Sequence, residues 1–348
     1  MRWCCLNALD ELAYAHGGPV VSARLRHLPE DFIVEEVATC RPYGEGEHAW
    51  LLVQKRGQNT EWVARELARF AGVENEAVSY AGLKDRHALT TQAFTVQLGQ
   101  SEEPDWQSMQ LEGCRILEAT RHRQRLRRGM LRENRFTLSL RDVTGQRDAV
   151  DTVLARIAQQ GVPNYFGPQR FGREGGNLLG AERLFNGEGQ QPERHLRGLY
   201  LSAARSYLFN RVLSERVSLR CWSEALPGEA LIMPGSDSTL SLPRIDAAIQ
   251  ARIERGDLQP SGPLWGRGQA LPKGEALLLE QRVLAHESAF CAGLERAGLK
   301  QQRRALVLRA REMSWEWLES DRLQIRFSLP PGSYATSVLR ELIGTDAC

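Results

Sequence analysis

One aspartate in this sequence lies directly between two cations, in the run Lys84-Asp85-Arg86. Gly82 stands just before the run, and an alternating, strand-like segment begins a few residues after it. Neighbouring positive charges favour the ionised form of a carboxylate, which suits a nucleophile or an electrostatic stabiliser and does not suit a general acid. On charge pattern alone, an ion pair in a surface loop is the commoner explanation, because structural ion pairs give the same pattern.

A second unusual segment runs from Gly161 to Gly172 and combines three aromatic residues, three glycines, two prolines, one arginine and two amides. Aromatic rings next to arginine and amide groups can stack on nucleobases and hold phosphates. A rigid, packed turn between domains is the structural alternative. The two interpretations are compatible, because a turn at a domain junction can also line a cleft.

A sheet is predicted around the first of these segments. Strands are expected at 31–37, 50–53, 94–98, 136–140 and 323–329. Alternation of apolar and polar residues in the last three predicts a mixed or largely antiparallel sheet with one exposed face. A helix is predicted from Thr60, as its N-cap, to Gly72, because Val63, Leu67 and Phe70 form an apolar stripe.

Helical periodicity dominates from about residue 147 to about residue 305, and the stripes lie at 150–157, 201–213, 245–253 and 275–298. The Gly- and Pro-rich run 256–274 is predicted to be loop. This order predicts an α+β fold. A mixed, largely antiparallel sheet domain is formed by 1–159 and 309–348, and a helix-rich α/β domain is inserted at 160–308.

The distribution of charge favours a polyanionic partner, although the net charge is only +2. Arginine is dense from Arg121 to Arg128 and recurs at Arg132. A second cluster comprises Lys300, Arg303, Arg304, Arg309 and Arg311. The planar guanidinium suits phosphate oxygens and stacks on bases. A solvated face balanced by nearby glutamates explains either cluster equally well.

Several classes of protein are excluded by composition. No stretch approaches the roughly 20 apolar residues that span a bilayer, and the N-terminus lacks the apolar run of a signal peptide. We therefore expect a cytosolic protein without a membrane partner. The seven cysteines are scattered and form no CxxC pair. This pattern predicts reduced, mostly buried thiols and neither a disulfide framework nor a zinc site.

The two unusual segments resemble the signature motifs of the tRNA pseudouridine synthase D (TruD) family. The family pattern GxKDxxAxTxQ is met at Gly82–Gln92, and NYFGxQRFG is met at Asn164–Gly172. Five further segments are similar and in the same order: Pro29–Glu35, Gly44–His48, Asn134–Leu138, Leu201–Ser206 and Pro331–Ser337. The resemblance runs from about residue 20 to about residue 343. It implies a pseudouridine-synthase-type sheet domain with an inserted TRUD-type domain.

The resemblance also implies roles for individual residues. Asp85 falls on the catalytic aspartate of the family, and Phe32 and Asn134 fall on positions that contact the substrate nucleotide. Tyr334 falls on a third such position, where other members have Phe, so the ring is kept and a hydroxyl is added. Phe136 corresponds to an aromatic residue near the target base.

Three cations complete the implied site. Lys84 and Arg86 are expected to hold the Asp85 carboxylate ionised or to bind phosphate, and Arg26, just before the first strand, is a further candidate to bind phosphate. The implied reaction is isomerisation of a tRNA uridine, at position 13, to pseudouridine after the base is flipped out of the RNA. This chemistry requires no cofactor and no metal. One chain carries every motif, so a monomer suffices.

Two alternatives remain open at this stage. A non-catalytic RNA-binding protein or RNA chaperone on the same scaffold would explain the basic clusters equally well, and it predicts that Asp85 is dispensable. A hydrolytic glycosidase would pair Asp85 with a second carboxylate, such as Asp31 or Glu35, about 5–9 Å away and with a raised pKa on one partner.

Overall fold

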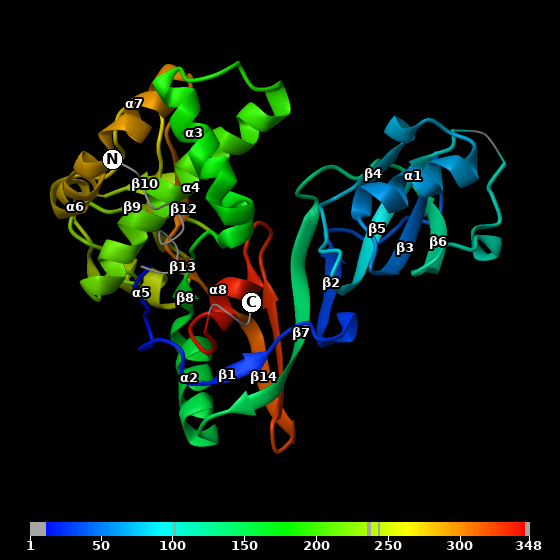
Figure 1. Ribbon diagram of the computed structural model, residues 1–348, viewed down its shortest axis with the longest axis horizontal. Coiled ribbons are helices and arrows are strands. Elements are labelled where there is room, and N and C mark those ends of the chain that lie inside the picture. Colours follow the sequence, from blue (N-terminus) through cyan, green and yellow to red (C-terminus); the bar gives the residue numbers. More distant parts are fainter. Residues whose placement is uncertain (1–11, 100–101, 235–237, 243, 345–348) are drawn as a thin grey trace. The chain divides into compact units, whose positions relative to one another are not determined.

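The computed structural model describes residues 12–99, 102–234, 238–242 and 244–344. Contacts within the chain divide it into two compact units, which are coloured along the sequence in Figure 1. The sheet unit comprises Val21–Gln146 and Ala310–Gly332. The helical unit comprises Arg147–Arg309 together with the described parts of both termini, 12–20 and 333–344.

The boundary at Arg147 coincides with the change from alternating to helical periodicity in the sequence. The units differ from the predicted division in three stretches and at Arg309, since 12–20, 147–159, Arg309 and 333–344 make their contacts within the helical unit. The predicted domain division, a catalytic domain of 1–159 and 309–348 with a domain inserted at 160–308, stays a prediction.

The sheet unit contains one large sheet with the strand order β14-β15-β7-β2-β5-β3-β6; β1 also pairs with β7, and β4 with β5. Its strands are β1 Ser22–Arg24, β2 Phe32–Ala38, β3 His48–Arg56, β4 Val78–Tyr80, β5 Leu89–Gln97, β6 Cys114–His122, β7 Leu131–Thr144, β14 Arg311–Glu319 and β15 Arg322–Leu329. Pairing is antiparallel except between β2 and β5. The predicted mixed, largely antiparallel sheet is therefore confirmed.

Helix α1 (Thr60–Ala71) covers part of this sheet. Val63 and Leu67 are buried against Leu51 and Phe94 of strands β3 and β5, as the apolar stripe predicted. The helix ends at Gly72, which adopts a left-handed conformation with φ of 66°. The predicted N-cap was wrong by one residue, since Asn59 holds that position and the Thr60 hydroxyl bonds elsewhere.

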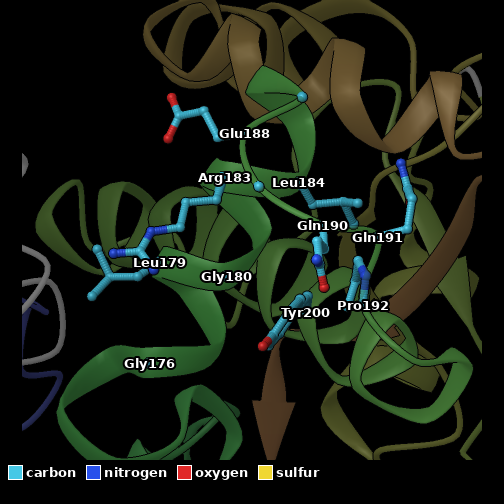
Figure 2. Close-up of a pocket in the computed structure, with 12 residues that line it drawn as sticks. Gly176, Leu179, Gly180, Arg183, Leu184, Glu188, Gln190, Gln191, Pro192 and Tyr200 are labelled. Atoms are coloured by element: carbon cyan, nitrogen blue, oxygen red, sulfur yellow. The ribbon is translucent and has the colours of Figure 1, made fainter.

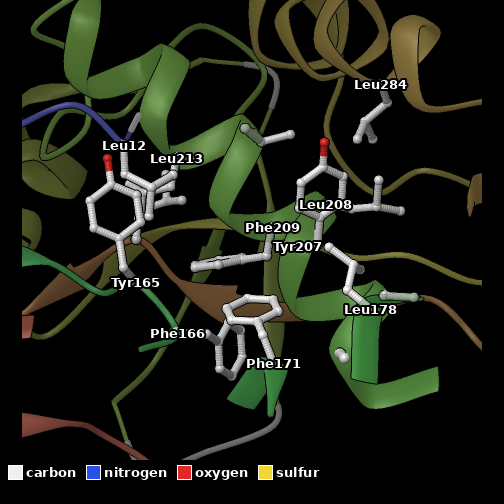
Figure 3. Packing of buried hydrophobic residues seen from close by; sticks show 14 of the residues in the cluster. Leu12, Tyr165, Phe166, Phe171, Leu178, Tyr207, Leu208, Phe209, Leu213 and Leu284 are labelled. Atoms are coloured by element: carbon white, nitrogen blue, oxygen red, sulfur yellow. The ribbon is translucent and has the colours of Figure 1, made fainter. Parts of the chain in front are cut away.

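The helical unit is built around the long helix α4 (Arg194–Ser218). Its other helices are α2 Arg147–Gln160, α3 Gly176–Asn186, α5 Ala247–Glu254, α6 Gly274–Leu284, α7 Ser288–Arg296 and α8 Ala335–Leu339. Figure 3 shows the core, in which Leu208 and Phe209 of α4 pack with Tyr165 and Phe166 of the aromatic segment. The single stripe at 275–298 is two helices, α6 and α7, joined by a short turn at Ala285–Glu287.

Short strands complete the helical unit. They are β8 Val162–Pro163, β9 Ala230–Ile232, β10 Thr239–Ser241, β11 Gln259–Leu264, β12 Gln302–Ala305 and β13 Val307–Leu308. The prediction that 256–274 is entirely loop was wrong for β11. Its sequence QPSGPL has no alternation, and it is a strand because it pairs with β9 and β12 in a small sheet.

Two predictions about composition can be compared with the structure. Four cysteines are free thiols, buried or half-buried, as expected: Cys40, Cys114, Cys221 and Cys291. Cys4, Cys5 and Cys348 lie outside the described residues. Most of the N-terminal segment on which the signal-peptide prediction was based also lies outside them. Within the described ranges, no helix combines the length and apolar character needed to cross a membrane.

Candidate active site

Asp85 lies in the loop 81–88 between strands β4 and β5. Strand pairing brings three chain segments to this point. Strand β5 starts at Leu89, which pairs with Arg56 at the end of β3 and with Ile33 near the start of the parallel strand β2. The segment before β2, the end of β3 and the loop before β5 therefore meet at one edge of the sheet.

Both carboxylate oxygens of Asp85 have a donor. Oδ2 lies 2.8 Å from an Nη atom of Arg26 in an ion pair, and Oδ1 accepts a hydrogen bond of 3.0 Å from the amide of His87. The side chain is 25% exposed, so the carboxylate is oriented without being sealed from solvent. An ionised, oriented and accessible carboxylate is what a nucleophile at a sugar carbon requires.

Arg26 is held in an unusual conformation. Its φ of 62° is in the left-handed region, which glycine adopts freely but which residues with a side chain, apart from Asn and Asp, rarely adopt. The guanidinium lies 4.3 Å from the ring centroid of Phe32, a cation–π contact. Its Nε is buried and has no hydrogen-bond partner among the described residues. Backbone strain of this kind is found where the surrounding structure fixes a functional side chain.

The cations adjacent to Asp85 in sequence do not neutralise it. The Lys84 ammonium forms a buried ion pair with Glu36, whose carboxylate is 1% exposed. Arg86 donates from Nε to the carbonyl of Gly57 at 3.0 Å. The expectation that the flanking cations hold the carboxylate is therefore corrected, because neighbours in an extended loop point to different sides. The cation that pairs with Asp85 is Arg26.

Lys55 lies beneath the loop and was missed in the sequence. Its side chain is fully buried, and Nζ donates to the main-chain carbonyls of Gln58 (2.8 Å), Asp85 (2.9 Å) and Lys84 (3.4 Å). Burial lowers the pKa of Lys55 from 10.5 to about 8, although the negative charge of Asp85 opposes this effect. The alternation of side chains along β3 could have predicted its burial, because Lys55 lies on the same inward face as Leu51 and Val53.

Thr60 and Gln92 fix the same loop from its other side. The Thr60 hydroxyl accepts from the amide of Lys84 and donates to Oε1 of Gln92, both at 3.0 Å. Nε2 of Gln92 donates to the carbonyl of Gly82 at 3.0 Å. Thr60 and Gln92 are buried, and together with Lys55 they determine the path of the backbone that presents Asp85.

Strands β2 and β7 supply the remaining predicted residues of the sheet unit. The rings of Phe32 and Phe136 meet edge to face at 6.1 Å, and Phe136 stacks on Phe327, also missed in the sequence, at 5.4 Å. Phe32 is 4% exposed and Phe136 is 8% exposed, so both rings belong largely to the core. Asn134 differs, since its Oδ1 is buried without a hydrogen-bond partner among the described residues.

An arginine-lined hollow of about 440 Å³ adjoins the loop. It is lined by Val78, Ser79, Tyr80, Arg125, Leu126, Arg127 and Arg128. The amide of Gly129 donates to the carbonyl of Ala81 at 2.8 Å, which ties the arginine segment to the start of the loop 81–88. Two other arginines of this cluster, Arg121 and Arg123, are paired with glutamates.

Comparison with known proteins shows which family the chain belongs to. The family model for tRNA pseudouridine synthase D (TruD) matches residues 8–191 and 177–342. The chain is 50% identical to tRNA pseudouridine synthase D of Nitrosococcus oceani over 336 residues, 96% of this chain and 94% of that protein. The chain belongs to the TruD family.

Two further TruD proteins extend the comparison. The Methylococcus capsulatus tRNA pseudouridine synthase D is 47% identical over 97% of this chain and 95% of that protein. A Methanosarcina mazei protein of known crystal structure, which carries the same family name, is 23% identical and matches with a TM-score of 0.76 over 95% of each chain. At this identity the Methanosarcina structure supports the TruD fold alone.

Tyr334 lies in the helical unit of this TruD protein. Its hydroxyl accepts a hydrogen bond of 2.9 Å from Arg170, and its ring contacts Phe166 at 6.4 Å. Its neighbours are thus residues of the aromatic segment.

The glycosidase alternative requires a second carboxylate with a raised pKa, and Asp31 does not provide one. The Asp31 side chain is buried and accepts two hydrogen bonds of 2.9 Å from Nε of Arg141. Burial opposes its ionisation, but the bonds from Arg141 and from the Leu28 amide outweigh it and lower the pKa of Asp31. Asp31 is a structural anion in this TruD protein.

The helical unit also contains a separate pocket of about 380 Å³ between α3 and the segment that follows it, shown in Figure 2. Its lining residues are Gly176, Leu179, Gly180, Arg183, Leu184, Gly187, Glu188, Gly189, Gln190, Gln191, Pro192 and Tyr200. No site residue predicted from the sequence lines it.

Proposed function

We propose that this chain isomerises a uridine of tRNA to pseudouridine, with Asp85 as the nucleophile. The observation that carries the proposal is the Asp85 carboxylate, which is ion-paired with Arg26, partly exposed, and held on a loop fixed from below by Lys55. Membership of the TruD family and close similarity to proteins named tRNA pseudouridine synthase D support the same reaction.

The reaction is redox-neutral and conserves every atom of the nucleotide except for exchange of hydrogen with water. The bond from C1′ to N1 breaks, the uracil turns, and a bond from C1′ to C5 forms. C5 loses its proton to water and N1 gains one. Asp85 assists departure of the base either by attack on C1′ or by promoting elimination at the sugar, and both routes use the same ionised carboxylate.

The target uridine is extruded from folded RNA in this proposal, at a cost of a few kcal/mol. Asn134 offers the uracil a polar group, because its buried Oδ1 has no hydrogen-bond partner in the described part of the chain and uracil N3–H is a donor. The ring of Phe32 makes a cation–π contact with Arg26, the arginine that pairs with Asp85. Phe136 is almost completely buried and packs against Phe32, so its role in this proposal is to hold Phe32 in place and not to stack on the base.

The finer assignments follow from family resemblance. The target is the uridine at position 13, Tyr334 contacts the RNA from the helical unit, and Arg86, exposed in the same loop, contacts phosphate. Lys84 acts through its ion pair with Glu36 and not as a phosphate ligand. We also propose that the protein is cytosolic and acts as a monomer without cofactor or metal.

The test uses unmodified tRNA with tritium at C5 of its uridines, incubated with purified protein and no added cofactor. Wild type should release tritium to water, and Asp85→Asn should bind tRNA without releasing any. Asp142→Asn is the matched control, since Asp142 pairs with the exposed Arg24 in the same unit and should keep full activity.

The outcome separates the proposal from the RNA-chaperone alternative. If wild type binds tRNA tightly but releases no tritium, the protein is a non-catalytic RNA-binding protein. Tritium release by Asp85→Asn would refute the assignment of Asp85 as the nucleophile. A second transcript with cytidine at position 13 tests the position. Tritium release that persists with that transcript would place the target elsewhere.

A further inference from the structure

Two guanidinium groups lie over the ring of Phe166 in the helical unit. The Arg304 carbon Cζ is 4.1 Å from the ring centroid, and that of Arg170 is 5.4 Å from it. Burial lowers the pKa of Arg304 to about 10, and the nearby positive charge of Arg170 acts in the same direction. Two cations of like charge, partly removed from water, are therefore held close together by the fold.

The partners of Arg170 are neutral. Its terminal nitrogens donate to the hydroxyls of Tyr334 (2.9 Å) and Ser202 (3.0 Å). Its Nε is buried and has no hydrogen-bond partner, and no carboxylate forms an ion pair with it in the described parts of the chain. A guanidinium that is half-buried without an anion leaves a positive charge to be neutralised by a ligand.

The groups around this charge suit one class of ligand. The planar fork of arginine matches the geometry of phosphate oxygens, and the two hydroxyls beside it can also donate to an anion. Arg170, Ser202 and Tyr334 are all partly exposed, so a ligand can reach them. Phe166 and Phe209 back the cluster with apolar surface that strengthens charge–charge attraction.

We propose that Arg170, with Arg304, Ser202 and Tyr334, forms a binding site for a phosphodiester of the RNA backbone. This inference rests on the proposed function only in taking tRNA as the RNA. The Tyr334 hydroxyl, which accepts a hydrogen bond from Arg170, orients the guanidinium toward that phosphate. Tyr334 is thus a positioning residue for the guanidinium in addition to any contact of its ring.

The experiment measures the affinity of a tRNA transcript, dephosphorylated at its 5′ end, as a function of salt concentration. Arg170→Gln should lower the affinity and reduce the slope of log affinity against log salt by about 1, the effect of one lost phosphate contact. Arg170→Lys should keep most of the slope. Tyr334→Phe should lower the affinity severalfold and leave the slope largely intact.

The matched control is Arg173→Gln. Arg173 lies three residues further along the same segment with its side chain 96% exposed, and it should change the slope little. Equal slopes for Arg170→Gln and wild type, in protein whose melting temperature is preserved, would overturn the site. If Arg170→Gln unfolds, the slope retained by Arg170→Lys and the affinity lost by Tyr334→Phe decide instead, and unchanged affinity in Tyr334→Phe would overturn the role of its hydroxyl.

Failure of this inference and failure of the proposed function give different results. If wild-type protein binds tRNA but releases no tritium, the proposed reaction is refuted, and the salt slopes of the variants still test the phosphate site. If wild-type protein releases tritium and the salt slope of Arg170→Gln equals that of wild type, only the phosphate site is refuted.

Discussion

The buried ammonium of Lys55 lies 2.9 Å from the main-chain carbonyl oxygen of Asp85. Lys55 belongs to strand β3, and the same Nζ bonds to the carbonyls of Gln58 and Lys84, so one cation joins two loops beneath the candidate nucleophile. An ammonium has three hydrogens to donate, and three carbonyls accept them. The position of the Asp85 backbone therefore depends on a buried charge of strand β3.

Lys55→Met is expected to lower kcat for tritium release about 100-fold and to change KM much less. Methionine keeps the length of the side chain but leaves buried carbonyls without donors, at about 1–3 kcal/mol each. A displacement of the catalytic group by about 1 Å is enough for a loss of this size. Lys273→Met, at an exposed lysine, is the control. Full activity in Lys55→Met would show that the loop holds its shape without the ammonium.

The low pKa of Lys55 gives a second prediction, about stability. The folded protein releases the proton of Lys55 at about pH 8, mainly because of burial, whereas the unfolded chain keeps it to about 10.5. The unfolded state binds more protons between these values, so the free energy of unfolding contributed by this group rises with pH across that window. In urea unfolding from pH 7.5 to 10, the free energy of unfolding of wild type should rise relative to that of Lys55→Met. A constant gap would contradict the assigned pKa.

Arg26→Gln is expected to reduce kcat about 10- to 100-fold. A hydrogen bond to a charged group contributes about 1.5–3 kcal/mol, and each 1.36 kcal/mol is tenfold in rate. Removal of the guanidinium leaves Oδ2 of Asp85 without its partner and uncovers the ring of Phe32. The control is Arg24→Gln, which removes an exposed ion pair with Asp142 two residues earlier. Equal rates for the two variants would show that the pair orients nothing.

Much of this arrangement could be predicted from local pattern. The strands around Val34, Phe94 and Phe136 and the helix with Val63 and Leu67 follow from alternation and from helical spacing, because burial on one face imposes both periods. Asp85 could be singled out by its charge environment and by resemblance to the TruD motif. The cation that pairs with Asp85 was not predicted, because Arg26 and not Lys84 or Arg86 holds this position.

The residues that hold Asp85 could not be predicted from local pattern, for a physical reason. Arg26 meets Asp85 because β2 and β5 are parallel neighbours, so the segments that precede them start from the same edge of the sheet. Alternation along a strand is the same whichever way its neighbour runs. Lys84 likewise pairs with Glu36 across strands and not with its neighbour in sequence. Strand β11 escaped prediction because tertiary pairing, not side-chain pattern, makes it a strand.

Asp31→Asn is expected to lower the free energy of unfolding by about 2–3 kcal/mol at pH 7, because the buried carboxylate accepts bonds from Arg141 and Leu28. The pKa of Asp31 is below its ordinary value of 3.8 in the folded protein, so its stabilisation is present above that pH and is lost as the pH falls through the folded value. In urea unfolding, the difference in the free energy of unfolding between wild type and variant should be constant well above pH 3.8 and should narrow as the pH falls below 3.8.

The control for this prediction is Glu30→Gln. Glu30 also pairs with an arginine, Arg56, but both side chains are about half exposed, so the pair should contribute less than about 1 kcal/mol. Equal losses from Asp31→Asn and Glu30→Gln would mean that burial does not distinguish the two carboxylates.

Neutralising the arginine-lined hollow should weaken tRNA binding and flatten its dependence on salt. Arg125, Arg127 and Arg128 are exposed and form no ion pair among the residues with assigned positions, and Gly129 ties their segment to the loop of Asp85. Phosphates drawn to this hollow would release counterions, at about 0.7–0.9 in the slope for each contact. Changing all three to Gln should lower the slope of log affinity against log salt by about 2.

A second triple variant separates this effect from loss of charge in general. Arg255, Arg282 and Arg326 are exposed as well, but each is paired with a carboxylate, so its charge is already balanced locally. Changing these three to Gln alters the net charge by the same amount and should leave the slope near that of wild type. If both triples lowered the slope equally, the net charge and not the hollow would govern binding. If neither did, the hollow would lie off the path of the RNA.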